Sequence, residues 1–155
     1  MDDLLTFLGT AAGDFGLGLS DEQLAQFGRY QALLEEWNQQ LNLTRIIEPR
    51  DVIIRHFLDS LTCATVMGEL GEQTVIDVGT GAGFPGLPLK ILYPEIKLTL
   101  VDSVTKKTTF LAAVAAELAL TEVTIVDQRV EEVGKDPAHR EKYDWVVARS
   151  VAEMR

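Results

Sequence analysis

One stretch of the chain combines residue types and spacing that could bind a charged ligand. In residues 74–86 a short β-branched segment is followed by four glycines within eight residues, at positions 79, 81, 83 and 86. β-branched residues favour extended backbone, and glycine permits positive φ and close approach of a ligand to the main chain. Pro85 suits the first turn of a following helix. The stretch therefore predicts a strand, a glycine-rich binding loop and a helix N-terminus.

Asp77 helps to choose among the ligands that use such a loop. NAD-dependent enzymes and S-adenosylmethionine-dependent enzymes both have one, and residues 81–86 satisfy the dinucleotide pattern G-x-G-x-x-G. A carboxylate two residues before Gly79 would repel a pyrophosphate at the helix N-terminus. It would attract the ammonium and sulfonium groups of S-adenosylmethionine, directly or through an ordered water. The loop chemistry thus favours S-adenosylmethionine, and an NAD-dependent oxidoreductase is the alternative.

Other chemistry-bearing residues end the strand-like runs that follow. Asp102 stands 23 residues after Gly79, where an acidic side chain can accept hydrogen bonds from both ribose hydroxyls. Glu131 follows the third run, where backbone groups could contact an adenine edge, although it could equally be an ordinary acid at a helix start. Arg149 ends the fourth run and could hold the cofactor, a phosphate or a guanine. The alternative for Arg149 is a structural arginine paired with Asp77 or Asp102.

These residues need a sheet that brings strand ends to one edge. Four strands are expected, at 75–78, 97–101, 123–126 and 144–148, and the segments between the first three have helical composition. The segment 106–120, rich in Ala and Leu, is the clearest crossover helix. Such alternation predicts an α/β fold with a mostly parallel sheet covered on both faces, in which ligands bind at the carboxyl ends of the strands.

The first part of the chain reads as helical. We expect a short helix over 3–15, and a longer one from Asp21 to about Gln40 that a Ser20/Gln23 capping box opens. A loop at 42–49 precedes a third helix, from about Arg50 to Met67, whose buried stripe would comprise Ile53, Ile54, Phe57, Leu58, Leu61 and Ala64. We expect residues 1–70 to pack as a helical segment on the domain whose ligand-binding core is 71–155.

A basic cluster interrupts this acidic protein, which carries a formal net charge of −10. Such a charge opposes broad nonspecific binding to nucleic acid, but Arg45, Arg50, Arg55 and His56 could form a local RNA-facing patch. A solvated helix edge is the alternative reading for the arginines, and a structural hydrogen-bonding role is the alternative for the histidine.

Composition sets the remaining expectations. The chain has 155 residues, 46% of them hydrophobic, which suits one folded domain. The sequence shows neither an apolar run near the roughly 20 residues of a membrane span nor the basic flank of a signal peptide, so we expect a cytoplasmic protein without membrane association. Cys63 is the single cysteine and reads as a small core residue. The spacing of Cys and His predicts no metal site.

Five motifs occur together in this chain. They are W-N-x-x-L-N-L-T at 37–44, R-H-F-L-D-S at 55–60, D-V-G-T-G-A-G-F-P-G-L-P-L at 77–89, L-V-D-S at 100–103 and R-V-E-E at 129–132. In this order they resemble the RsmG family, also called glucose-inhibited division protein B (GidB), of 16S rRNA guanine-N7 methyltransferases. The resemblance covers residues from about 24 to 155. It implies a Rossmann-like class I methyltransferase fold and methyl transfer from S-adenosylmethionine to one guanine of the small ribosomal subunit.

The resemblance also implies roles for particular residues. Arg149 would lie between cofactor and target base as the catalytic positioning residue, and Val130 stands where the family usually has Ala. Together with the loop chemistry, this gives a set of expected cofactor-binding residues: Asp77, Gly79, Thr80, Gly81, Gly83, Phe84, Asp102, Ser103, Val130, Glu131 and Arg149.

Family members continue beyond the point where this chain stops, so we expect a fragment whose last strands are missing and whose parent is a monomer. A fragment of this kind could also be a noncatalytic RNA-binding unit, which is a further alternative to the enzyme.

Overall fold

The computed structural model describes residues 2–136 and 142–148. Its centre is a parallel sheet of β1 (Thr74–Val78), β2 (Lys97–Asp102), β3 (Val123–Asp127) and β4 (Trp145–Val147). The strand order is β3-β2-β1-β4, and Asp77 pairs in register with Leu100 and Val147. All four strands match the predicted positions, so the predicted parallel sheet is confirmed.

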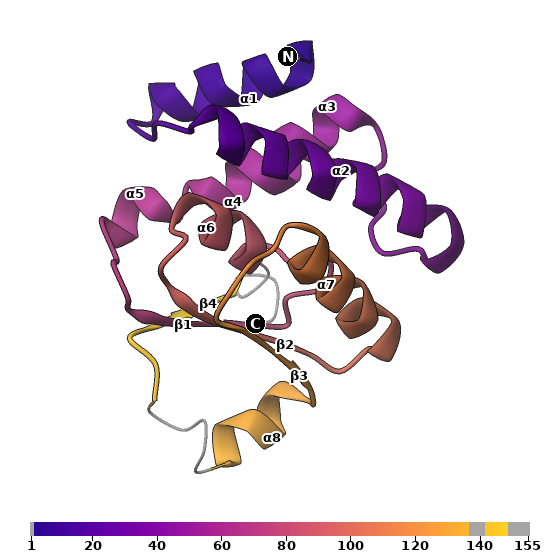
Figure 1. Ribbon diagram of the computed structural model, residues 1–155. Coiled ribbons are helices and arrows are strands. Elements are labelled where there is room, and N and C mark those ends of the chain that lie inside the picture. The colour runs from indigo at the N-terminus through magenta and orange to yellow at the C-terminus, as the bar shows by residue number, and fades with distance from the viewer. Residues whose placement is uncertain (1, 137–141, 149–155) are drawn as a thin grey trace.

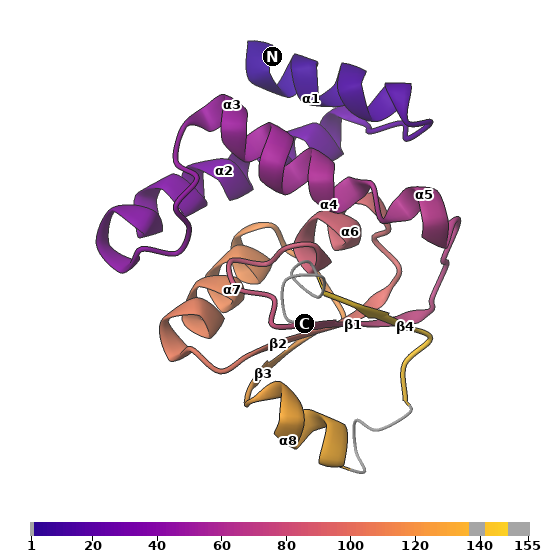
Figure 2. The ribbon, with the colours of Figure 1, turned by 180° about the vertical axis from the view of Figure 1, so that it is seen from behind.

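Helices cover the sheet on both faces, as Figures 1 and 2 show. α6 (Gly86–Leu92) and α7 (Thr105–Glu117) lie on one face, whereas α8 (Val130–Lys135) lies on the other. The chain therefore changes face after β3 and returns to place β4 beside β1. The strand order reverses between β1 and β4, and in open α/β sheets such a point forms the ligand-binding crevice at the carboxyl ends of the strands.

The N-terminal helices form a further layer above α6 and α7 (Figure 1). α1 (Asp3–Asp14) and α2 (Asp21–Leu41) agree with the predicted segments. The capping box is present: Ser20 N donates to Gln23 Oε1 at 2.8 Å, and Gln23 N donates to Ser20 Oγ at 3.1 Å. One continuous hydrophobic cluster extends from Leu8 in α1 to Leu118 after α7. The helical layer and the sheet therefore share a core.

The segment predicted as one regular helix from Arg50 to Met67 is instead a series of short helices. It comprises α3 (Pro49–Asp51), a π-helix η1 (Val52–Leu58), α4 (Asp59–Leu61) and α5 (Ala64–Met67). A π-helix closes its hydrogen bonds over five residues and so rotates side chains relative to an α-helix. As a result Ile54, expected in the buried stripe, is 42% exposed, and His56 is buried at 5% exposure. The predicted buried stripe is therefore wrong in including Ile54 and in leaving out His56.

Lys90 is a buried lysine in α6 whose ammonium group is bonded to backbone carbonyls. Its side chain is 1% exposed, and its Nζ donates to Ile96 O at 2.6 Å and to Pro94 O at 2.7 Å. Burial lowers the pKa of the Lys90 ammonium, and the negative charge of Glu122 partly opposes this shift. Lys90 therefore ties the end of α6 to the start of β2.

The packing around Gly86 gives a stability prediction. A Cβ atom at Gly86 would lie 2.5 Å from Leu100 Cδ2 and 2.8 Å from Asp77 Oδ2. We expect Gly86→Ala to lower the free energy of unfolding by about 2 kcal/mol, because overpacking a full interior forces its neighbours apart. Urea denaturation followed by circular dichroism measures this change.

Gly134 provides the matched control. It lies within α8, and a Cβ atom there meets nothing within 4 Å. Gly134→Ala should leave stability unchanged or raise it by about 0.5 kcal/mol, because alanine favours helices over glycine. Equal effects of the two substitutions would contradict the packing described here.

Candidate cofactor-binding site

The glycine loop begins where β1 ends, and a buried carboxylate closes it. Asp77 is fully buried, and its Oδ2 accepts hydrogen bonds from Thr80 Oγ1 at 2.6 Å and from Gly86 N at 2.8 Å. These contacts join the end of β1, the loop and the first residue of α6. Asp77 has no exposed surface in this structure, and its hydrogen bonds fix the shape of the loop. The expected contact of Asp77 with a bound ligand, direct or through an ordered water, stays a prediction.

The four glycines of the loop serve two different purposes. Gly79 and Gly81 have φ of +69° and +60°, and a Cβ atom on either would meet nothing within 4 Å. Gly83, with φ of +106°, packs so tightly that a Cβ would lie 2.5 Å from the Tyr30 hydroxyl and from Leu87. Gly86 is equally confined. Gly79 and Gly81 therefore leave room for a ligand, whereas Gly83 and Gly86 let the loop pack on the protein.

Asp102 holds the loop from the next strand. Its Oδ2 accepts from Gly81 N at 2.8 Å, and its Oδ1 accepts from Val104 N at 2.9 Å. Asp102 is 8% exposed. A carboxylate has about four acceptor sites, so these two bonds leave capacity for ribose hydroxyls at the strand end. The position of Asp102 fits the predicted ribose contact. Its hydrogen bond with Gly81 N also holds the loop in place, a role that the sequence did not suggest.

Aromatic side chains support the loop from inside the protein. The Phe84 ring stacks on His56, with centroids 4.1 Å apart and planes inclined by 5°, and on Tyr30 at 5.5 Å. Tyr30 donates its hydroxyl hydrogen to Ala82 O at 2.5 Å. Phe84 is only 3% exposed and backs the loop from the interior, so its expected contact with the cofactor stays a prediction. Tyr30 was not among the residues singled out from the sequence, since helical spacing can mark a core position but cannot identify the partner of a hydroxyl.

The predicted RNA-facing cluster divides in the structure. Arg45, Arg50 and Arg55 are exposed, and the Arg50 guanidinium lies 4.2 Å above the ring of Phe7. His56 is buried, and its Nε2 is 2.8 Å from Thr44 Oγ1. The prediction that His56 faces RNA is therefore wrong, because the π-helix turns this ring inward against Phe84. Its structural role was the alternative reading.

The remaining predicted cofactor residues lie near the same edge of the sheet. Ser103 is exposed directly after Asp102, and Val130 and Glu131 are exposed at the start of α8, which follows β3. Asp102 and Asp127 are register partners at the ends of β2 and β3, so these segments are neighbours. Arg149, expected between cofactor and base, lies outside the described residues.

Neither a reactive thiol nor a metal cluster is found in the described part of the chain. Burial raises the pKa of the Cys63 thiol, and the charges of Asp59 and Asp77 raise it further. The thiol therefore stays protonated at neutral pH, as suits a packing residue. Over residues 2–136 and 142–148, no group of three or more His, Cys, Asp or Glu side chains could hold a metal ion. None of the helices described there is long and apolar enough to cross a bilayer.

The start of α6 is already engaged by the protein. In dinucleotide-binding folds the pyrophosphate sits at the N-terminus of the helix after the glycine loop. Here the buried carboxylate of Asp77 accepts the hydrogen bond of Gly86 N at this end of α6. An anion would meet this negative charge at the first turn. The geometry therefore favours a ligand that carries positive charge over a pyrophosphate.

Solved structures share this fold at low sequence identity. A structure of MtNAS in complex with MTA and tNA has a TM-score of 0.54 and 12% identity, covering 79% of this chain and 46% of that one. Coclaurine N-methyltransferase bound to N-methylheliamine and SAH has a TM-score of 0.52 and 16% identity, covering 95% and 50%. The predicted Rossmann-like fold, with a parallel sheet behind an N-terminal helical segment, is confirmed.

Sequence relatives are much more similar. The ribosomal RNA small subunit methyltransferase G of Roseiflexus castenholzii is 53% identical over 154 residues, which are 99% of this chain and 64% of that protein. The protein of the same name from Desulforamulus reducens is 44% identical over 155 residues, 100% of this chain and 65% of that protein. The chain thus spans slightly less than two thirds of the length of these relatives.

A family model matches residues 23–155, a range that includes the glycine loop, Asp77 and Asp102. Together with the relatives, this match confirms the resemblance that the five motifs indicated. The chain belongs to the GidB family, described as rRNA small subunit methyltransferase G.

Proposed function

We propose that the protein carrying this chain transfers a methyl group from S-adenosylmethionine to N7 of a guanine in 16S rRNA of the small ribosomal subunit. The observation that carries the proposal is the open face of Gly79 and Gly81 beside the Asp102 carboxylate, in a chain of the GidB family. The names of the relatives support the rRNA substrate. The choice of guanine N7 comes from the family resemblance. We expect a protein with this reaction to act in the cytoplasm, where ribosomal subunits are found.

The residues present suit this cofactor. The backbone at Gly79 and Gly81 is open to an amino-acid arm, and Asp102 lies where a ribose would be held. Ser103 and the exposed start of α8, with Val130 and Glu131, extend the same edge toward an adenine. The NAD alternative is less well supported, because Asp77 occupies the N–H group that a pyrophosphate would need.

The reaction requires the protein mainly to position the two reactants. When bound, S-adenosylmethionine supplies an electrophilic methyl group on a positively charged sulfur. Guanine N7 has a free lone pair: a new N–C bond forms as the C–S bond breaks, and the electron pair of that bond stays on sulfur. No proton has to be removed, so Asp102 and the fixed loop contribute by alignment, which can supply most of the acceleration. Carboxylates near the pocket also suit the positive charge that develops on the purine.

The exposed arginines form a surface that could bind the phosphates of the RNA. Arg45 and Arg55 come from the segments before and within the π-helix that packs on the loop through Phe84. Phosphate contacts of this kind position an RNA without reading its sequence. Loss of these arginines would weaken binding of any RNA and leave cofactor binding intact, which is also what a noncatalytic RNA-binding unit would show. Methyl transfer therefore separates the enzyme from that alternative.

Cofactor binding gives the first test of the proposal. Asp102→Asn removes the negative charge and one acceptor from the loop and the ribose site, and should raise the Kd for S-adenosylmethionine about tenfold or more, as for other charge-assisted hydrogen bonds. Isothermal titration calorimetry of the 155-residue chain measures the change.

Asp144 is the matched control for this substitution. Its carboxylate accepts bonds from Thr74 N and Thr74 Oγ1 at the opposite, amino end of the sheet. Asp144→Asn should leave the affinity for S-adenosylmethionine unchanged. Binding of NAD in place of S-adenosylmethionine, or equal losses in both variants, would contradict the proposed cofactor site.

Methyl transfer gives the second test. The intact protein that carries this chain, incubated with methyl-labelled S-adenosylmethionine and small ribosomal subunits, should label 16S rRNA. Chemical cleavage at N7-methylguanine should then cut at a single position. Labelling of a different atom, or of protein instead of RNA, would refute the proposed reaction even if the cofactor binds.

A further inference from the structure

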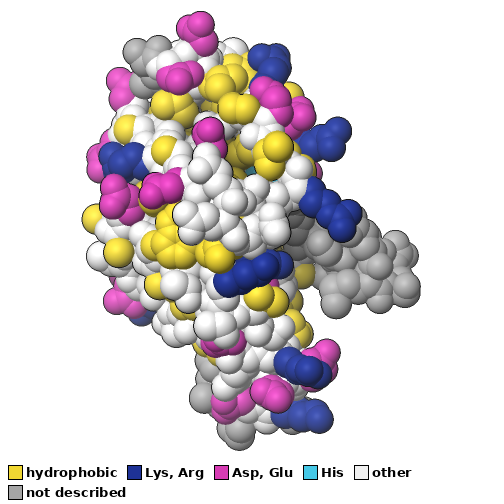
Figure 3. Space-filling view, turned by 90° about the vertical axis from the view of Figure 1, so that its right-hand side faces the viewer, with side chains coloured by type: hydrophobic (Ala, Val, Ile, Leu, Met, Phe, Trp, Pro, Cys, Tyr) yellow, Lys and Arg dark blue, Asp and Glu magenta, His cyan; other side chains and the backbone are white. Residues whose placement is uncertain are grey.

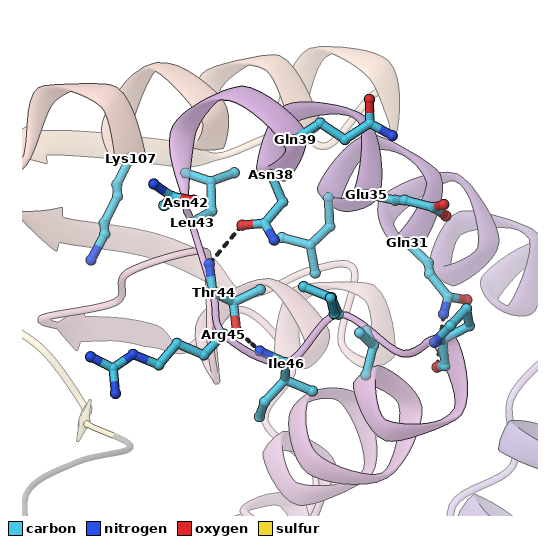
Figure 4. Close-up of a pocket in the computed structure, with 14 residues that line it drawn as sticks. Gln31, Glu35, Asn38, Gln39, Asn42, Leu43, Thr44, Arg45, Ile46 and Lys107 are labelled. Carbon is cyan, nitrogen blue, oxygen red and sulfur yellow. Dashed lines mark hydrogen bonds between the residues drawn. The ribbon is translucent and has the colours of Figure 1, made fainter.

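A cavity of about 1080 Å³ lies near the cofactor loop but is separate from it. It is open to solvent on one side and is lined by the C-terminal half of α2, by the segment 42–49 and by Lys107 in the first turn of α7 (Figure 4). Residues 79–86 and Asp102 do not line it. The volume slightly exceeds the usual upper end of small-molecule sites, so the hollow has room for one nucleotide. The cavity therefore offers a second binding place next to the cofactor cradle.

The lining of this cavity combines an apolar floor with one exposed apolar side chain. Leu34, Leu43 and Val52 line it and are buried. Ile47, also on the lining, is 70% exposed. A large side chain exposed at the edge of a cavity is a surface that a flat ring could cover. The floor thus suits the face of a nucleobase.

Carboxamides stand above this floor. Among the hydrogen bonds of the described residues, the Asn38 and Gln31 side chains are used to fix the loop: Asn38 Oδ1 accepts from Thr44 N at 2.8 Å, and Gln31 Nε2 donates to Pro49 O at 2.9 Å. Gln39 and Asn42 also line the cavity and are exposed, and no hydrogen bond of either side chain occurs in the same described part. Each carboxamide has a donor and an acceptor, the combination that pairs with base edges.

Charge is arranged unevenly around the opening. Arg45 and Lys107 lie toward one end of the cavity, and Glu35 lies toward the other (Figure 4). On the face shown in Figure 3, several Lys and Arg side chains lie through the middle and right-hand part. On a chain with a formal net charge of −10, two cations at one end of a cavity favour a phosphate there.

The cavity is also connected to the cofactor loop by contacts. Thr44 lines the cavity, and its Oγ1 lies 2.8 Å from His56 Nε2. The His56 ring stacks on Phe84 within the glycine loop. Whatever fills the cavity is therefore held next to the cofactor loop at a fixed relative position.

We propose that this cavity holds an unpaired, non-reacting nucleotide of the RNA, with its base against Ile47 and hydrogen-bonded to a lining carboxamide, Gln39 or Asn42, and its phosphate at Arg45 and Lys107. The inference rests on the proposed function for the identity of the RNA. Sequence-specific recognition of RNA commonly uses such unstacked bases. The occupied cavity would orient the strand so that the neighbouring guanine reaches the cofactor.

RNA binding by the 155-residue chain tests this assignment. The probes are a fluorescein-labelled ten-nucleotide single-stranded RNA of mixed sequence and a ribose-phosphate oligomer of equal length without bases, followed by fluorescence anisotropy. The double variant Gln39→Ala/Asn42→Gly removes both carboxamides, and glycine keeps the φ of +50° at position 42. It should weaken intact RNA about fivefold to tenfold and leave the base-free oligomer unchanged. Lys107→Ala should weaken both about threefold and reduce the salt dependence of binding.

Two neighbours serve as controls, and each outcome has a meaning. Gln40 and Lys106 are exposed next to the altered residues but do not line the cavity, so Gln40→Ala and Lys106→Ala should have much smaller effects. Equal losses for both probes in the double variant, no loss, or no RNA binding by the unaltered chain would overturn the nucleotide site. If base-dependent binding is found but S-adenosylmethionine neither binds nor is consumed by the intact protein, the site stands and the proposed function fails.

Discussion

The buried carboxylate of Asp77 is the interaction on which the rest of the site depends. Its Oδ2 joins Thr80 and Gly86, which lie on either side of the loop, at 2.6 and 2.8 Å. Removing a carboxylate from water is costly unless hydrogen bonds replace the lost hydration. Any movement of the loop away from Asp77 would give up these bonds. These two hydrogen bonds therefore fix the loop between β1 and α6.

Two further contacts make this loop rigid on both sides. Asp102 accepts from Gly81 on the side that faces the strand ends, and the Phe84 ring packs on Tyr30 and His56 on the interior side. The loop thus keeps an open strip of backbone at Gly79, where a ligand can approach. Because His56 also meets Thr44, the position of the segment 42–49 is set relative to that strip. One connected set of packed side chains therefore links the proposed sites for cofactor and RNA.

Much of the fold could be predicted from the sequence because its signals are local. β-branched runs mark the strands, and the capping box at Ser20 marks the start of α2. The errors arose where tertiary packing decides. The π-helix moves His56 inward and Ile54 outward, and periodicity alone assumes a regular α-helix. The importance of Asp77 was predicted, but not its partners, since a hydrogen bond to a backbone N–H nine residues later leaves no pattern in the sequence. Glycine spacing likewise could not separate the two open glycines from the two packed ones.

Amide NMR spectra of the 155-residue chain during titration with S-adenosylhomocysteine test the central claim most directly. If the loop is a rigid cradle held by Asp77, the amides of Gly79, Gly81 and Ser103 should shift strongly. The amide of Gly86 should stay in place, because its hydrogen bond to Asp77 persists. Large shifts at Gly86, or shifts confined to residues 42–49, would contradict the account.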